Sequence, residues 1–156
     1  MSEHTDVESV ERVIPAPPEK IFELLVDPER HRDIDGSGSV KDPKGETERL
    51  KLGSKFGMHM KIGLPYSMES TVIAFEEGRT IAWQSRPPGI GRHFGGGRIW
   101  RYELEPVDGG TRVRESWDIS QETGGSKWLV GLEGSRKRTR ESMTKTLERI
   151  EELVKA

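Results

Sequence analysis

The segment RYELEPVDGGTRVRESWDIS, residues 101–120, constrains the fold of this chain more than any other. At its centre, Asp108 and Gly109 supply the two residues that a tight hairpin turn needs, because both residue types tolerate a positive φ. The flanking segments are therefore predicted to be antiparallel neighbours, with a register fixed by pairing Val107 with Gly110. The fold is accordingly expected to contain an antiparallel sheet.

This register gives the hairpin an apolar inward face and a charged outward face. The inward cross-strand pairs are Leu104 with Val113, Tyr102 with Glu115, and Trp100 with Trp117. The outward pairs are Glu105 with Arg112 and Glu103 with Arg114, each expected to stabilise the ladder by about 0.2–1 kcal/mol. Because a slip of one residue would bury these charges, the register is well specified. Glu115 is thus expected to point inward beside Tyr102.

Length and composition limit the class of protein. The 156 residues suit one domain, residues 1–156, with a single core. The formal net charge of −2 provides no overall field that attracts nucleic acid or an anionic membrane. The absence of cysteine excludes disulfides and thiolate chemistry. Since no apolar run in the sequence is long enough to span a bilayer, we expect a soluble cytoplasmic protein without stable membrane insertion.

The remaining periodicities predict a strand, two short helices, a run of antiparallel strands and a long terminal helix. Besides the hairpin, strands are expected at 7–14, 56–62, 67–75 and 80–84, with an interruption at Pro65 and an irregular strand or loop at 41–50. Helices are expected after the prolines at 17 and 18, and from an Asp27 cap through Ile34. From Arg136 onward, one helical stripe carries Met143, Leu147, Ile150 and Val154. This order is an α+β layout.

Four segments in this order, ERVIPAPPEKIFELLVDPER, LKLGSKF, VIAFEEGRTIAWQS and YELEPVDGGTRV, resemble the polyketide cyclase/dehydrase-like branch of the START/SRPBCC superfamily, which includes the birch-pollen-allergen-like proteins. The resemblance covers nearly the whole chain. It implies a helix-grip fold, in which a curved antiparallel sheet wraps a long C-terminal helix and encloses an internal cavity. The chain departs from its relatives in the second short helix, where His31 and Ile34 stand at positions that often carry an aromatic residue.

An internal cavity has an energetic cost. Empty apolar volume costs roughly 24 cal/mol per Å³, so a dry hollow of about 300 Å³ would cost ~7 kcal/mol. The total stability of a domain is only about 5–15 kcal/mol. The interior is therefore expected either to hold a ligand or to be closed by side chains.

The inward Glu115 and Tyr102 are the candidate functional pair. Their side chains either satisfy one another as buried polar groups, or anchor a ligand, or carry out general acid/base catalysis with a carboxyl pKa raised by desolvation. The wider set of expected ligand contacts is Trp100, Tyr102, Glu115, Trp117, Met58, Met60, His31, Phe94 and Trp128.

Three of these contacts are expected at the opening of the cavity rather than inside it. The resemblance implies that the region around the second short helix forms a cavity rim, where a neutral imidazole at His31 would donate to a ligand oxygen. Phe94, together with Ile90 in the segment RPPGIGRHFGGG, suits a lid over the cavity mouth. Trp128 either lines the entrance or packs in a loosely formed helical turn.

The histidines, the glycine-rich segment and the basic run have structural interpretations. Strict alternation sends His59 to solvent, and no histidine pair has the spacing of a metal motif, so neither metal nor cofactor is expected. The glycine-rich segment lacks the Lys-Ser/Thr that follows a phosphate-binding loop. The basic run SRKRTR, residues 135–140, is expected to be a solvated helix face.

Three functions remain open from sequence. The first is a carrier or sensor of a small hydrophobic ligand such as a lipid, polyketide or isoprenoid-like compound. The second, implied by the resemblance, is a cyclase or dehydratase in which Glu115 moves protons. The third is a regulatory module that uses its basic helix to contact a protein partner, which the sequence does not identify. Fold alone does not choose among them.

Overall fold

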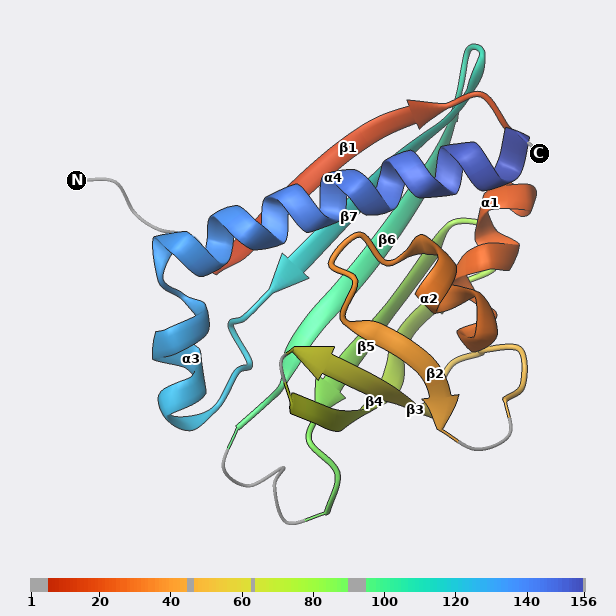
Figure 1. Ribbon diagram of the computed structural model, residues 1–156. Helices are drawn as coiled ribbons and strands as arrows, with labels where there is room; N and C mark the ends of the chain where they lie inside the picture. The colour runs from red at the N-terminus through yellow and green to blue at the C-terminus, as the bar shows by residue number, and fades with distance from the viewer. Residues whose placement is uncertain (1–5, 45–46, 63, 90–94, 156) are drawn as a thin grey trace.

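The computed structural model describes residues 6–44, 47–62, 64–89 and 95–155. The elements follow the predicted order of one strand, short helices, a run of strands and a long helix (Figure 1). They are β1 (Val7–Ile14), α1 (Pro18–Leu25), η1 (Pro28–Arg30), α2 (His31–Ile34), β2 (Val40–Lys44), β3 (Lys55–Ile62), β4 (Leu64–Glu76), β5 (Thr80–Arg86), β6 (Arg98–Val107), β7 (Gly110–Asp118), α3 (Gly124–Val130) and α4 (Glu133–Lys155).

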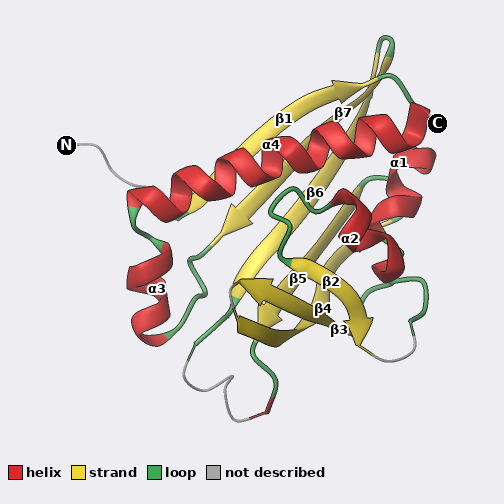
Figure 2. Cartoon of the chain, viewed as in Figure 1, coloured by secondary structure: helices red, strands yellow, loops and turns green. Residues whose placement is uncertain are grey.

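The strands form one curved antiparallel sheet. Within the described residues it has seven strands in the order β1-β7-β6-β5-β4-β3-β2, so the first strand of the chain pairs with the last. Helix α4 crosses one face of this sheet, and α1 and α2 lie beside the C-terminal half of α4 (Figure 2). A curved antiparallel sheet around a long C-terminal helix confirms the predicted α+β helix-grip fold.

The hairpin between β6 and β7 has the predicted register. Val107 pairs with Gly110, Tyr102 with Glu115, and Trp100 with Trp117. On the outer face, Arg112 contacts the Glu105 carboxylate at 3.2 Å, as expected. Arg114, however, reaches Glu11 of β1 at 3.9 Å instead of the predicted Glu103. Strand β1 adds a second neighbour to β7, and this neighbour competes for the Arg114 side chain.

Several predicted boundaries differ from the structure, and the starts of β4 and α4 differ most. Strand β4 begins at Leu64 and therefore includes Pro65, which was expected to interrupt the run of strands. A proline is tolerated at the start of a strand, where the missing N–H removes little of the ladder. The terminal helix α4 begins at Glu133, ahead of the predicted Arg136, and is preceded by a separate short helix, α3.

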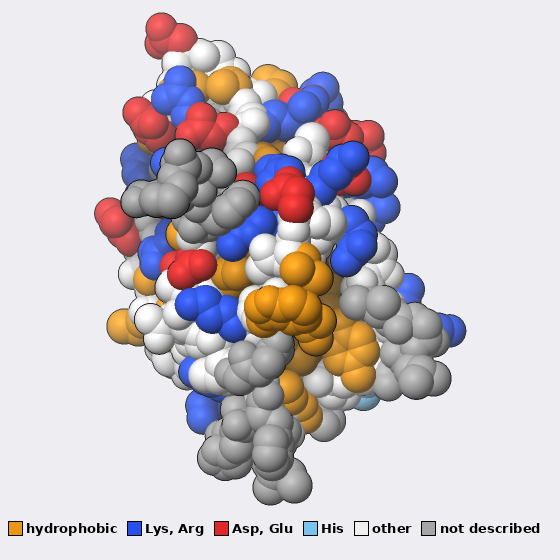
Figure 3. All heavy atoms as spheres, turned by 90° about the vertical axis from the view of Figure 1, so that its left-hand side faces the viewer, with side chains coloured by type: hydrophobic (Ala, Val, Ile, Leu, Met, Phe, Trp, Pro, Cys, Tyr) orange, Lys and Arg blue, Asp and Glu red, His pale blue; other side chains and the backbone are white. Residues whose placement is uncertain are grey.

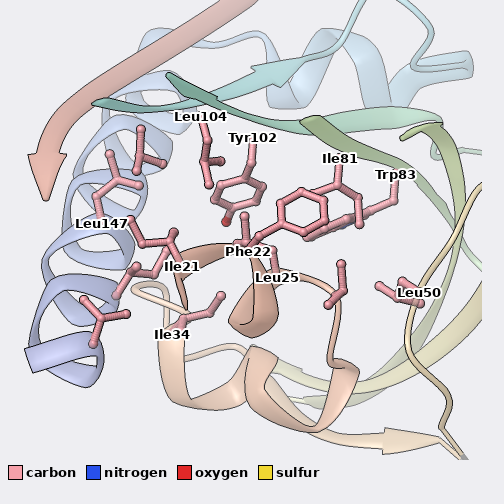
Figure 4. Close-up of a cluster of buried hydrophobic side chains, with 14 of the residues drawn as sticks. Ile21, Phe22, Leu25, Ile34, Leu50, Ile81, Trp83, Tyr102, Leu104 and Leu147 are labelled. Atoms are coloured by element: carbon pink, nitrogen blue, oxygen red, sulfur yellow. The ribbon is translucent and has the colours of Figure 1, made fainter. Parts of the chain in front are cut away.

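The core lies between the sheet and the helices. All four residues of the predicted stripe on α4, Met143, Leu147, Ile150 and Val154, are buried. Leu147 faces the side chains of Ile21 and Ile34 from the short helices (Figure 4). On the sheet side, Ile81, Tyr102 and Leu104 point into the same space. The short helices thereby close one end of the grip.

The contact between α2 and α4 depends on Gly36, and this gives a prediction. A Cβ at Gly36 would lie 2.1 Å from the Ser142 carbonyl oxygen, and the Gly36 N–H donates to Thr146 Oγ1 at 2.8 Å. We expect Gly36→Ala to lower the free energy of unfolding by about 1–3 kcal/mol, because the helices must separate. Urea denaturation measures this change.

Gly134→Ala is the matched control for that variant. Nothing lies within 4 Å of a Cβ at Gly134, which is near the start of α4. Alanine favours the helix, so this change is expected to be neutral or stabilising by up to about 1 kcal/mol. Equal effects of the two substitutions would contradict a close helix contact at Gly36.

Candidate functional site

The candidate site is centred on Glu115 of β7. The sheet register places it between Val10 of β1 and Tyr102 of β6, so these three side chains share one face. That face is inward: Glu115 is only 2% exposed and Tyr102 only 4%. The alternation of the hairpin therefore delivers a carboxyl group to the interior of the grip, as predicted.

The carboxyl group of Glu115 is only partly satisfied. The Tyr102 hydroxyl donates a hydrogen bond to it. Its Oε1 is buried and has no hydrogen-bond partner among the described residues. A buried polar atom without a partner costs about 1–3 kcal/mol, so its retention at this position requires an explanation.

Burial controls the protonation of this pair. Desolvation raises the pKa of Glu115 well above its ordinary value. The hydrogen bond from Tyr102 lowers this pKa, and the negative charge of Asp35 raises it, but desolvation is the largest effect. Burial also raises the pKa of Tyr102 well above its usual value. The site therefore favours an uncharged carboxylic acid beside an uncharged phenol. A neutral carboxylic acid has an O–H donor in addition to its acceptor oxygens.

An aromatic cluster lies next to Tyr102. Trp83 of β5 stacks on His31 with ring centroids 5.0 Å apart and an interplanar angle of 20°. Trp83 also contacts Phe56 at 5.6 Å and Tyr102 at 5.7 Å. Rings at these separations are in direct contact, so no further ring fits between them. The cluster occupies the part of the interior nearest to α2, where Trp83 and Tyr102 point towards Phe22 and Leu25 (Figure 4).

His31 belongs to this cluster and not to the rim of a cavity, where the sequence placed it. It is 6% exposed, and its Nε2–H donates to the Leu25 carbonyl oxygen at 2.9 Å. Burial lowers the pKa of His31, which favours the neutral ring. The imidazole is held by the backbone on one edge and by Trp83 on its face, because α2 turns it inward.

The core divides into two clusters that are joined by Val10, the cross-strand neighbour of Glu115, and by Trp100. The smaller one consists of Trp117, Ile119 and Met143, and lies towards α3. The partly buried Val10 and Trp100 pack against both this cluster and the larger one. The name "seam" is used below for the residues at this boundary, which are Val10, Trp100, Tyr102, Glu115 and Trp117. The unpartnered Oε1 belongs to the seam.

Two surface hollows are outlined by the described residues, and neither is lined by Tyr102 or Glu115. One has a volume of about 480 Å³ beside α3; its lining is Asp6, Ile119, Lys127, Trp128, Gly131, Leu132 and Arg136. The other, of about 340 Å³, lies over the charged outer face of the sheet around Glu103 and Arg112. The first shares Ile119 with the smaller core cluster, so it lies directly over that end of the interior.

The predicted ligand contacts separate into groups. The seam brings together Trp100, Tyr102, Glu115 and Trp117. Met58 is buried and Met60 partly buried in the larger cluster, on β3. Trp128 is 71% exposed on α3, and His59 is exposed as predicted. Phe94 and the proposed lid residue Ile90 lie outside the described residues.

The sequence reasoning missed Trp83 as a site residue. In the segment TIAWQS, alternation alone places Ile81, Trp83 and Ser85 on one face, and all three are buried. The alternation of this segment is therefore the sequence signal for Trp83, which pairs directly with Trp100 of β6.

The basic run at the start of α4 is only partly solvated, so the prediction of a solvated helix face is wrong for Arg136. The Arg136 side chain is buried; its Nε donates to the Gly131 carbonyl oxygen at 2.8 Å and its Nη1 to Glu8 at 3.4 Å. Arg140 reaches the same Glu8 carboxylate at 3.2 Å. These arginines join α4 to β1, because an inward-facing acid on the edge strand lies beneath them.

Among the described residues, no group of three or more His, Asp or Glu side chains is arranged to hold a metal ion. None of the helices in this part of the chain combines the length and apolarity needed to cross a membrane.

Comparison with known proteins agrees with this fold and interior. Residues 6–155 match the family described as polyketide cyclase / dehydrase and lipid transport. The chain belongs to this family.

Individual relatives add detail without adding an activity. The chain is 37% identical over 107 residues to the uncharacterized protein Rv0088 of Mycobacterium tuberculosis; the match covers 67% of this chain and 44% of that protein. The chain thus spans less than half the length of this curated relative.

Solved structures show the same fold at low identity. Protein CV1439 from Chromobacterium violaceum has a TM-score of 0.72 at 16% identity, covering 97% of this chain and 98% of that one. Ara h 8.0201 has a TM-score of 0.66 at 15% identity, covering 95% of this chain and 96% of that one. These neighbours establish the helix-grip architecture of the family member described here.

Proposed function

We propose that this protein binds a small apolar molecule at the seam, and that the molecule presents an uncharged oxygen to Glu115. Carriage or sensing of such a compound is the function that the geometry supports best. The single observation that carries the proposal is the buried Oε1 of Glu115, which has no partner among the described residues although Tyr102 donates a hydrogen bond to the same carboxyl group.

A ligand oxygen would remove the cost of this unsatisfied group. Leaving the carboxyl oxygen unpaired costs about 1–3 kcal/mol, and a hydrogen bond to the ligand recovers part of that free energy. The surrounding rings and aliphatic side chains give the remainder of the ligand an apolar environment. Trp100 is only partly buried, and Met143 has a flexible side chain, so this boundary is easier to open than the stacked rings around Trp83.

The charge state of the site selects for uncharged ligands. The carboxyl group is favoured in its neutral form by desolvation, and the charge that acts on it besides Tyr102 is the negative Asp35. A ligand carboxylate would therefore be buried without a cation to balance it, which is costly. Ketones, phenols and alcohols fit the site better than fatty-acid anions.

A second function is favoured by the same raised pKa. A carboxylic acid that keeps its proton at neutral pH is a general acid, able to protonate the carbonyl oxygen of a bound polyketide during ring closure or to assist loss of a hydroxyl as water. Conversion of a poly-β-ketone mimic by the wild-type protein, lost in Glu115→Gln, would support this catalytic function. Binding without conversion supports carriage.

Calorimetric titration with three naphthalene compounds tests the binding proposal. We expect wild-type protein to bind 2-acetylnaphthalene about tenfold more tightly than 2-ethylnaphthalene, which has the same shape but no carbonyl, and to bind 2-naphthoate least. Glu115→Leu removes the hydrogen bond and should abolish the preference for the ketone. Glu103→Leu, on the outward face of the same hairpin, is the matched control and should keep it.

Two results would contradict this proposal. One is a preference for the ketone that persists in Glu115→Leu, since the oxygen would then be recognised elsewhere. The other is tighter binding of 2-naphthoate than of the ketone, since its carboxylate would be buried near the negative Asp35 without a cation to balance it.

A further inference from the structure

Helix α3 exposes an unusual set of large apolar side chains. Trp128 is 71% exposed, Leu129 58%, and Leu132, at the junction with α4, 47%. Hydrophobic side chains gather on the face of the molecule that carries this helix, below a region of mixed charge (Figure 3). The name "α3 surface" is used for Trp128, Leu129 and Leu132. Exposed apolar residues in a contiguous group mark an interaction site more often than scattered ones do.

The start of α4, next to the α3 surface, carries two exposed cations, Lys137 and Arg138, and one exposed acid, Glu141, one turn beyond Lys137. Lys127 contacts Asp6 at 3.5 Å, and Arg140 contacts Glu133 at 2.8 Å, so these two acids are neutralised locally. Neither Lys137 nor Arg138 has an acidic partner within ion-pair distance among the described residues.

We propose that the α3 surface docks on an anionic lipid bilayer, with Lys137 and Arg138 held at the headgroups. An exposed tryptophan beside leucines suits the boundary between headgroups and acyl chains, because its indole ring is mostly apolar but carries one polar N–H group. Each lysine or arginine near an anionic surface adds to the electrostatic attraction. A small apolar surface alone binds a membrane only weakly. Together with basic residues that contact the anionic headgroups, it gives reversible attachment.

The docked orientation would place the hollow beside α3 against the membrane. Trp128 and Leu132 line this hollow, and so does Ile119, which packs with Trp117 and Met143. Apolar side chains are thus continuous from the α3 surface to the seam. An apolar ligand could pass along them from the bilayer to Glu115; this route rests on the proposed function, whereas docking itself does not.

Vesicle sedimentation tests the docking proposal. The wild-type chain should sediment with phosphatidylcholine vesicles that contain phosphatidylglycerol, and weakly with phosphatidylcholine alone. The double variants Trp128→Ser/Leu132→Ser and Lys137→Glu/Arg138→Glu should each bind at least about tenfold more weakly. Leu52→Ser alters a leucine that is 64% exposed in the turn before β3 and should bind as wild type does. Circular dichroism confirms that each variant is folded.

The outcomes separate this proposal from its alternatives. Failure of wild-type protein to sediment with the anionic vesicles, or unchanged sedimentation of Trp128→Ser/Leu132→Ser, would overturn it. A wild-type dimer that the same variant converts to a monomer, without vesicle binding, would assign the α3 surface to self-association and also overturn it. Glu115→Leu should still bind vesicles, so a failure of the seam as a ligand site leaves the docking result unaffected.

Discussion

Replacing Trp117 with alanine is expected to lower the free energy of unfolding by about 3–5 kcal/mol. The indole is 2% exposed and packs with Ile119 and Met143, so its removal leaves a large cavity at the end of the core nearest to α3. Chemical denaturation followed by circular dichroism measures the change.

Trp128→Ala is the matched control, because it removes the same side chain from a position that is 71% exposed. This variant should stay within about 0.5 kcal/mol of wild type. Similar losses in the two variants would contradict the inward direction of Trp117, and with it the sheet register that sets the candidate site.

Glu115→Gln is expected to make the folded protein more stable than wild type at neutral pH, by an amount that grows with pH. Burial raises the pKa of Glu115 in the folded state above its value in the unfolded chain. The free energy of unfolding of the wild-type protein is therefore highest, as far as Glu115 is concerned, below the unfolded pKa of about 4.3. It falls as the pH rises from there towards the folded pKa. Glutamine has nothing to ionise, so it avoids this loss.

Urea denaturation over a series of pH values measures the difference between the two proteins. Between the unfolded and folded pKa values the difference should widen by about 1.4 kcal/mol per pH unit. The lowered pKa of His31 destabilises both proteins below about pH 6.5, so it cancels in this comparison. Glu103→Gln, at an exposed position of β6, should follow wild type throughout. Parallel curves for Glu115→Gln and wild type would contradict a desolvated carboxyl.

The parts of the fold that sequence predicted are those fixed by local patterns. Alternation with period two and the Asp108-Gly109 turn determine the β6–β7 register, because a slip would bury the charges of Glu105 and Arg112. The stripe on α4 follows from helical spacing in the same way, and its residue Leu147 is buried as expected. Both signals depend on neighbours within one element or one hairpin.

The parts that sequence did not predict depend on contacts between distant segments. His31 is buried because its ring stacks on Trp83 of β5 and contacts the ring of Phe56 of β3. Arg136 is buried because Glu8 of β1 lies beneath it. For the candidate site, the inward Glu115–Tyr102 pair follows from hairpin alternation, whereas the unpartnered Oε1 depends on which side chains of other elements reach it. No periodicity encodes that information.

The central claim, that Glu115 is a neutral acid at the seam and contacts a ligand oxygen, is tested most directly by carbon-13 NMR of its side-chain carboxyl carbon. In wild-type protein at neutral pH, we predict the chemical shift of a protonated carboxyl and a change in that shift on addition of 2-acetylnaphthalene. A carboxylate shift at neutral pH, or a resonance that stays unchanged when the protein is saturated with the ketone, would contradict the account.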